Sequence, residues 1–283
     1  MLSAGDRQLD LSSPVCMGVL NITPDSFSDG SQFAQAGAPS FSVDLDRVLA
    51  RAGEMVDEGA SILDIGGEST RPGAEAVAVE QELERVIPVI EALRANFDIC
   101  ISVDTSAAQV MKEAINAGAD LVNDIRALSE EGALEEVVSS TVGACLMHMQ
   151  GQPRTMQQNF TYDNVVEEVY EFLAARVRDC VDAGVARDRI LVDPGFGFGK
   201  SVQHNYKLLQ NLRRFQDLGA PILVGLSRKS MLGAITDRPV TDRLPASVAA
   251  ATLALQEGAS IVRSHDVAAT VDAIRVHCAY EDA

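Results

Sequence analysis

Chemically capable side chains recur along this chain at one kind of position, the point where a short apolar run ends. Eight such runs are followed, in order, by Asn21, Asp64, Asp104, Asn123, His148, Asp193, Lys229 and Arg263. Any one of these residues could simply be a polar cap on a strand. Eight in order favour a shared pocket instead, because a fold that gathers the strand ends at one rim brings such residues together.

One subset of these residues combines carboxylates with an amide. Asp104, Asn123 and Asp193 could bind the edge of a flat heterocycle through paired hydrogen bonds. Pterin and guanine rings present such an edge, with N–H donors beside a carbonyl acceptor. The sequence therefore predicts a polar floor that binds a flat, nitrogen-rich ring.

A second subset is cationic. Lys229, Arg263 and His265, together with Arg71, suit an anion such as phosphate or diphosphate. In α/β barrels the loops after the last two strands are the usual phosphate position. Asn21 adds a neutral oxygen that could ligate Mg²⁺ beside phosphate oxygens.

The segment Asp193-Pro-Gly-Phe-Gly-Phe-Gly-Lys200 is rich in glycine but lacks the spacing of a nucleotide phosphate loop. It is either a flexible turn or a place where the backbone approaches a ligand. Of the adjacent Arg228 and Lys229, we expect one to point inward. His148 is interpreted either as a pocket residue or as a histidine behind the pocket, and the four histidines show no zinc-ligand spacing.

Short apolar runs that alternate with longer segments of helical period must position these residues. The predicted strands are residues 15–20, 61–65, 99–103, 120–123, 143–147, 190–192, 221–225 and 260–263. The predicted helices are residues 43–58, 80–95, 107–117, 130–140, 162–183, 203–213, 244–257 and 267–278.

Eight strand–helix units in one chain of 283 residues favour a closed barrel over an open sheet. We expect one α/β domain over residues 1–283, a (β/α)₈ TIM barrel with its core at about 15–278. Residues 1–13 and 280–283 are predicted to be loose. The segments 21–41 and 69–79, after the first two strands, are longer than the usual connection of about 2–6 residues, which makes them candidate lids.

Charge and composition exclude several classes of protein. The formal net charge of -18 disfavours nucleic acid and anionic membranes as partners. No apolar run reaches the roughly 18 residues of a membrane span, and residues 1–10 lack the features of a signal peptide. The five widely spaced cysteines are typical of core residues in a reducing compartment. We therefore expect a cytoplasmic protein that binds small molecules.

An ordered set of motifs resembles the dihydropteroate synthase family. The resemblance runs from about residue 15 to residue 270. Its motifs are Asn21-Ile-Thr-Pro-Asp-Ser-Phe-Ser-Asp29-Gly30, Asp64-Ile-Gly-Gly-Glu-Ser-Thr-Arg71-Pro72-Gly73, Ser102-Val-Asp104-Thr105, Val122-Asn123-Asp124-Ile125, Met147-His-Met-Gln-Gly151, Asp193-Pro-Gly-Phe-Gly-Phe-Gly-Lys200, Gly225-Leu-Ser-Arg-Lys-Ser230 and Arg263-Ser-His265-Asp-Val.

This resemblance implies a transferase of folate biosynthesis. The enzyme would condense 6-hydroxymethyl-7,8-dihydropterin diphosphate with para-aminobenzoate, giving 7,8-dihydropteroate and diphosphate. Mg²⁺ would assist the loss of diphosphate, and the amine would attack a pterin methylene cation. A homodimer, formed through the late helices, is also implied by the resemblance.

The resemblance further assigns roles to single residues. The catalytic set is Asp104, Lys229, Arg263 and Asp29. The pterin-binding set is Asp104, Asn123, Ile125, Met147, Asp193, Gly197, Lys229 and Arg263. The diphosphate-binding set is Asn21, Arg71, Arg263 and His265, with Asn21 also the metal ligand. The para-aminobenzoate pocket comprises Phe27, Thr70, Pro72, Phe198, Lys229 and Ser230.

Three alternatives remain open on the sequence. The pterin-binding module of a corrinoid methyltransferase shares the barrel and the acid–amide set but has no use for Arg71 and Lys229 around a diphosphate. A binding-only paralogue is disfavoured by the intact candidate site residues. A barrel aldolase could form a Schiff base at Lys229, with Arg228 lowering the pKa of that lysine.

Overall fold

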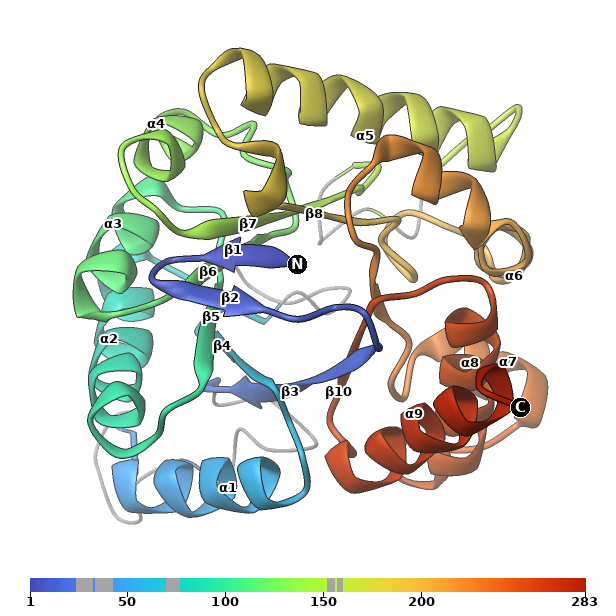
Figure 1. Ribbon diagram of the computed structural model, residues 1–283, viewed down its shortest axis with the longest axis horizontal. Helices are drawn as coiled ribbons and strands as arrows, with labels where there is room; N and C mark the ends of the chain where they lie inside the picture. Colours follow the sequence, from blue (N-terminus) through green and yellow to red (C-terminus); the bar gives the residue numbers. More distant parts are fainter. Residues whose placement is uncertain (24–32, 34–42, 70–76, 152–155, 157–159) are drawn as a thin grey trace.

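Eight parallel strands close into a barrel in this computed structural model, which describes residues 1–23, 33, 43–69, 77–151, 156 and 160–283 (Figure 1). The sheet order is β8-β7-β6-β5-β4-β3-β10-β9, and a parallel bridge between Val192 and Ile222 joins β8 to the segment that enters β9. The predicted (β/α)₈ barrel is therefore confirmed. Its strands are β3 (Val15–Asn21), β4 (Ile62–Gly66), β5 (Cys100–Asp104), β6 (Leu121–Asp124), β7 (Gly143–Met147), β8 (Ile190–Asp193), β9 (Leu223–Gly225) and β10 (Ile261–Ser264).

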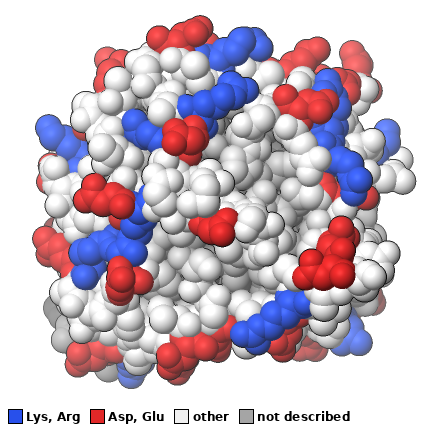
Figure 2. Space-filling view, viewed as in Figure 1, with Lys and Arg blue, Asp and Glu red and all other residues white. Residues whose placement is uncertain are grey.

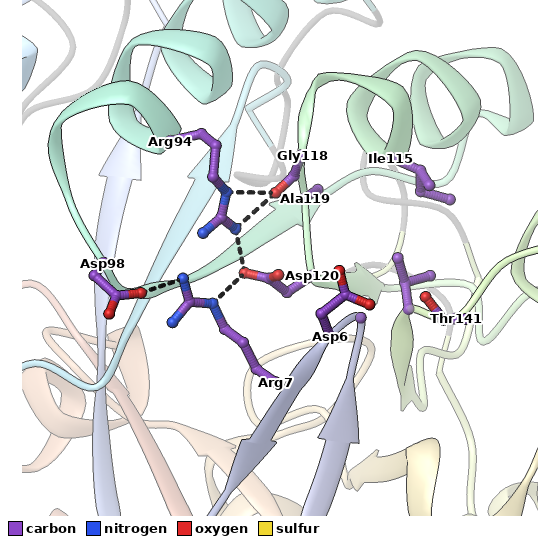
Figure 3. A pocket seen from close by; sticks show the side chains of 11 residues that line it. Asp6, Arg7, Arg94, Asp98, Ile115, Gly118, Ala119, Asp120 and Thr141 are labelled. Carbon is purple, nitrogen blue, oxygen red and sulfur yellow. Dashed lines mark hydrogen bonds and ion pairs between the residues drawn. The ribbon is translucent and has the colours of Figure 1, made fainter.

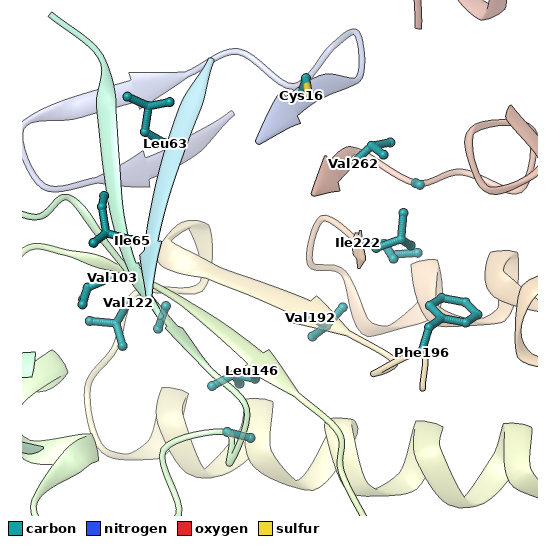
Figure 4. Close-up of a cluster of buried hydrophobic side chains, with 14 of the residues drawn as sticks. Cys16, Leu63, Ile65, Val103, Val122, Leu146, Val192, Phe196, Ile222 and Val262 are labelled. Atoms are coloured by element: carbon teal, nitrogen blue, oxygen red, sulfur yellow. The ribbon is translucent and has the colours of Figure 1, made fainter. Parts of the chain in front are cut away.

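Helices surround the barrel and cover the outward side chains of its strands. Leu63, Val103 and Val192 are fully buried in this outer layer, because both faces of each strand are covered (Figure 4). The helices are α1 (Leu45–Asp57), α2 (Val79–Asn96), α3 (Ala108–Ala117), α4 (Ala133–Val138), α5 (Val165–Asp182), α6 (Val202–Gln210), α7 (Ser230–Thr236), α8 (Leu244–Gln256) and α9 (Val267–Glu281). Short 3₁₀ segments are η1 (Arg187–Arg189), η2 (Leu212–Leu218) and η3 (Val240–Asp242).

Most predicted helices lie within about three residues of their observed bounds. The prediction did not include α7, whose seven residues are too few to show a helical period. The prediction for residues 280–283 was wrong in part, because α9 continues to Glu281. No helix within the described ranges combines the length and the apolar character that a membrane span requires.

The prediction of a loose segment at residues 1–13 was wrong. An antiparallel hairpin of β1 (Leu2–Ala4) and β2 (Arg7–Leu9) closes the amino-terminal end of the barrel (Figure 1). Leu2 and Ala4 are fully buried against one layer of inward side chains. That layer comprises Met17, Ile62, Cys100, Leu121, Cys145, Leu191, Leu223 and Ile261.

A cavity of about 590 Å³ opens beside this hairpin, away from the carboxyl ends of the strands (Figure 3). Its cationic side chains already have partners. Arg7 pairs with Asp98 at 2.6 Å and with Asp120 at 3.4 Å, and Arg94 pairs with Asp120. Charges of both signs are distributed over this face (Figure 2). The amino-terminal end of a barrel usually contributes to stability and not to catalysis. We therefore interpret these ion pairs as structural contacts that join the hairpin, α2 and Asp120, the residue before β6.

Candidate active site

The alternation of side chains along each strand places the polar residues directly above the buried apolar layer. Residues two apart on a strand point to the same side, so Asp64 shares the barrel interior with Ile62, and Asn123 shares it with Leu121. The same spacing relates Asp193 to Leu191 on β8. The carboxyl end of the barrel therefore has a polar floor over an apolar base.

Arg263 is the centre of this floor. Its Nε donates to Asp64 Oδ2 at 2.6 Å, and its Nη2 donates to Asp104 Oδ2 at 2.8 Å. Asn123 Nδ2 donates to the same Asp64 oxygen at 3.2 Å. Charge-assisted bonds from a planar guanidinium fix orientation as well as position. Four strands thus hold one connected network, and all four members belong to the eight residues expected to meet at one rim.

Burial changes the acid–base behaviour of the floor. It raises the pKa of Asp104 to about 7, although the Arg263 guanidinium opposes the shift. Burial also raises the pKa of Asp193, opposed by the hydrogen bond from the Gly195 N–H and by Lys229. Carboxyl groups with a raised pKa in a concave site are typical of functional sites.

Lys229 points into the site, whereas Arg228 points away from it. Lys229 Nζ donates to the Phe196 carbonyl at 2.7 Å and lies 4.3 Å from the centre of the Phe198 ring. Burial lowers the pKa of Lys229 to about 8, opposed by Asp193. Arg228 instead pairs with Asp266, with Nε to Oδ2 at 2.9 Å. A nearby cation that lowers the pKa of Lys229 is Arg263.

An apolar wall flanks the polar floor. Ile125, Met147, Met156 and Phe198 form one buried cluster, separate from the two larger apolar clusters. Three of the four belong to the predicted pterin and para-aminobenzoate sets. A flat aromatic ligand needs such a surface for its faces and the polar floor for its edge.

In the strand order of the barrel, Asn21 and His265 lie on the other side of Asp104 from the apolar wall. Asn21 Nδ2 and His265 Nε2 are 3.5 Å apart, and His265 Nδ1 lies 3.0 Å from Ser227 Oγ. Asn21 and Asp104 flank Gly66 in the strand register. A Cβ atom at Gly66 would come within 3.8 Å of both side chains, so the glycine leaves open space between them.

The chemistry of the donors fits a Mg²⁺ ion bound together with a phosphate ligand. Among the described residues, no group of three His, Cys, Asp or Glu side chains could hold a metal by itself. Asn21 supplies one hard, neutral oxygen. This suits Mg²⁺, which usually keeps several waters and takes few protein ligands beside substrate phosphates.

The structure says less about the remaining predicted site residues. Phe27, Asp29, Thr70, Arg71 and Pro72 lie outside the described residues, so their roles stay predictions. Ser230 is the first residue of α7 and is exposed. A Cβ atom at Gly197 would lie 3.2 Å from Lys229 Cδ, which puts its backbone against that side chain.

Sequence reasoning missed the roles of three residues. Asp64 holds both Arg263 and Asn123, and its shared strand face with Ile62 was a usable signal. Ser227 orients His265, and no sequence pattern indicates this contact. Lys200, the end of the glycine-rich segment, is buried against His148, which lies behind the pocket.

Fold and site together define a barrel enzyme that binds a flat, hydrogen-bonding ring beside an anion. Residues 17–265 match the family model of pterin binding enzymes. A dihydropteroate synthase of Haemophilus influenzae is 56% identical over 275 residues, which cover 97% of each chain. The Yersinia pestis dihydropteroate synthase with a sulfonamide drug complex superposes with a TM-score of 0.94 at 48% identity, covering 100% of this chain and 99% of that one.

A second solved structure, the Burkholderia cenocepacia dihydropteroate synthase complexed with 7,8-dihydropteroate, has a TM-score of 0.86 at 47% identity. It covers 99% of this chain and 96% of its own. The chain belongs to the dihydropteroate synthases, a family of pterin binding transferases. The methyltransferase, binding-only and aldolase alternatives are therefore set aside.

Proposed function

We propose that the polar floor and the cationic rim together condense 6-hydroxymethyl-7,8-dihydropterin diphosphate with para-aminobenzoate. The C–O bond between the pterin methylene and diphosphate breaks, a C–N bond to the amine forms, and the amine releases one proton. The observation that carries this proposal is the network that joins Arg263 to Asp64 and Asp104, with Asn123 bonded to Asp64.

The floor residues suit the pterin ring. Asp193 and Asn123 would bind the polar edge, Ile125 and Met147 would contact a face, and Arg263 would stack on the ring. Because Arg263 is already fixed by two carboxylates, its guanidinium plane needs no reorganisation when the ring binds. This rigidity supports its assignment to the stacking role.

Asp104 suits the stabilisation of the methylene cation. Its carboxylate is held at the floor, and burial in a low-dielectric site strengthens its interaction with a developing positive charge. Lys229 and Phe198 would line the para-aminobenzoate pocket, where the lysine could pair with the benzoate. An aryl amine is a weak base and is unprotonated at neutral pH, so it requires no strong general base.

His265 and Arg263, with Arg71 from the second loop, would bind the diphosphate. Asn21 would ligate Mg²⁺, which when bound neutralises charge on the departing diphosphate. His265 is oriented for its role by Ser227 at 3.0 Å. Asp29 is proposed to lie near the same ion.

The test is diphosphate release from the purified chain with both substrates, measured with and without Mg²⁺. We expect stoichiometric dihydropteroate and diphosphate, with Mg²⁺ increasing the rate. Release of diphosphate without dihydropteroate would contradict the condensation. Methyl transfer from a tetrahydrofolate donor, run in parallel, should give no product.

We also propose a cytoplasmic homodimer. Four large apolar side chains on the neighbouring helices α7, α8 and α9 are each at least 50% exposed, and a second copy would cover them. They are Ile235, Leu253, Val276 and Tyr280. Cytoplasmic location is supported by five cysteines without a disulfide. Light scattering of wild type and Leu253→Asp should give the dimer mass and the monomer mass respectively, and a monomeric wild type would contradict the proposal.

A further inference from the structure

Lys200 is a buried lysine whose Nζ is surrounded by neutral acceptors. The residue is 2% exposed. Its Nζ donates to the carbonyls of Gly195 at 2.8 Å, Phe198 at 3.0 Å and His148 at 3.3 Å. The same atom lies 2.9 Å from His148 Nδ1. Over the described ranges no salt bridge joins it to a carboxylate.

Such a residue is costly for stability. A buried ammonium without an ion-pair partner loses its hydration, and only its hydrogen bonds to the surrounding acceptors offset that cost. Burial lowers the pKa of Lys200 to about 7, opposed by Asp193, and lowers the pKa of His148 to about 2. Packing alone therefore gives no reason for a lysine here.

The reason lies in the loop that wraps around Nζ. Gly195 has a left-handed backbone (φ 72°), and a Cβ atom there would come within 1.9 Å of the His148 carbonyl oxygen. Gly195 and Phe198 are thus drawn to one point beside the end of β7. The ring of Phe196 is anchored separately, in the apolar layer outside the barrel (Figure 4).

The same loop supplies the contacts of Lys229. The Phe196 carbonyl accepts from Lys229 Nζ at 2.7 Å, and the Phe198 ring lies 4.3 Å from that atom. The Gly195 N–H donates to Asp193 Oδ1 at 2.7 Å. A displacement of the loop would move the Lys229 ammonium and the Phe198 ring together, whereas Asp104 and Asn123 are held by their strands.

We propose that Lys200 is a positioning residue for the condensation. Its ammonium gathers the carbonyls of the glycine-rich loop and the His148 imidazole, and so holds Phe198 and Lys229 in the geometry that the amine substrate requires. The proposal deepens the proposed function and rests on it. It assigns Lys200 no contact with either substrate.

The test compares Lys200→Met, which removes the charge at similar length, with Lys207→Met, a control on the exposed face of α6. A displacement of about 1 Å can cost about 10²-fold in rate. We therefore expect Lys200→Met to lower kcat/KM for para-aminobenzoate at least tenfold, with a higher KM for that substrate. KM for the pterin diphosphate should rise by a clearly smaller factor, because Asp104 and Asn123 stay on their strands although the loop contacts Asp193 and Lys229. Lys207→Met should match wild type.

A second variant covers the case in which Lys200→Met does not fold. His148→Leu keeps the lysine and its carbonyl partners but removes one acceptor, and the Phe172 ring at 5.0 Å offers the new side chain an apolar neighbour. We expect the same selectivity for the amine substrate at about threefold. Equal rises in both KM values, or no rise in a folded variant, would overturn the proposal. An inactive wild type would instead refute the proposed function.

Discussion

The substitution Asp104→Asn tests the reaction most directly. The side chains have nearly the same shape, and the amide oxygen of asparagine can still accept from Arg263 Nη2, which lies 2.8 Å from the aspartate. Arg263 also keeps Asp64 at 2.6 Å, so the floor should stay assembled. The change therefore removes one negative charge without removing the network.

Loss of a preorganised electrostatic contact costs about 10²–10³ in kcat, or about 2.7–4 kcal/mol. We expect Asp104→Asn to lower kcat by that factor, because the amide cannot stabilise a methylene cation as a carboxylate does. The assay is initial-rate diphosphate release at saturating substrates. Asp237→Asn, at an exposed helix end, is the matched control and should retain wild-type turnover.

The pH profile adds a second measurement. The pKa of Asp104 is raised to about 7, so its ionised fraction grows as pH increases through neutrality. Wild-type kcat should rise over this range, and the rise should be absent in Asp104→Asn. Turnover of the variant within threefold of wild type, or an unchanged acid limb, would refute the role given to this carboxylate.

Three further substitutions have defined outcomes. Glu82 is buried, and burial raises its pKa from 4.5 to about 7, so the folded state binds its proton more tightly and this carboxyl group costs stability as pH rises from 4.5 to 7. Urea titrations should show the stability of Glu82→Gln gaining about 2.5 kcal/mol on wild type between pH 5 and pH 8, from about 1.36 kcal/mol per pKa unit. Glu84→Gln, at an exposed position on the same helix, is the control and should follow wild type. Leu2→Ala should lower the free energy of unfolding by about 2–5 kcal/mol, since the residue is fully buried, and a loss below about 0.5 kcal/mol would mean that the hairpin is not docked in solution. Asn21→Ala should raise the Mg²⁺ concentration for half-maximal rate, and an unchanged requirement would exclude Asn21 as a ligand.

The sequence was informative where strand periodicity governs structure. Asp104, Asn123 and Asp193 follow apolar runs, and a parallel barrel brings such positions to one rim. The pairing of Asp64 with Arg263 joins residues 199 positions apart and depends on which side chains face each other across the barrel. Periodicity cannot supply that information.

Short elements were also difficult to predict from the sequence. Each strand of the hairpin has three residues, too few for an alternating pattern to stand out from chance. The burial of Lys200 was equally hidden, because a lysine that ends a glycine-rich segment suggests solvent or a ligand. The loop residues around Phe27 and Arg71 lie outside the described ranges, and their roles remain predictions.

The hairpin has a consequence for the order of folding. Leu2 is synthesised long before Leu191, Leu223 and Ile261, yet all four belong to one buried cluster. Contacts of such long sequence separation form slowly, because a long stretch of chain must be closed before they stabilise anything. The amino-terminal segment can therefore complete its packing only after the final strand has been synthesised.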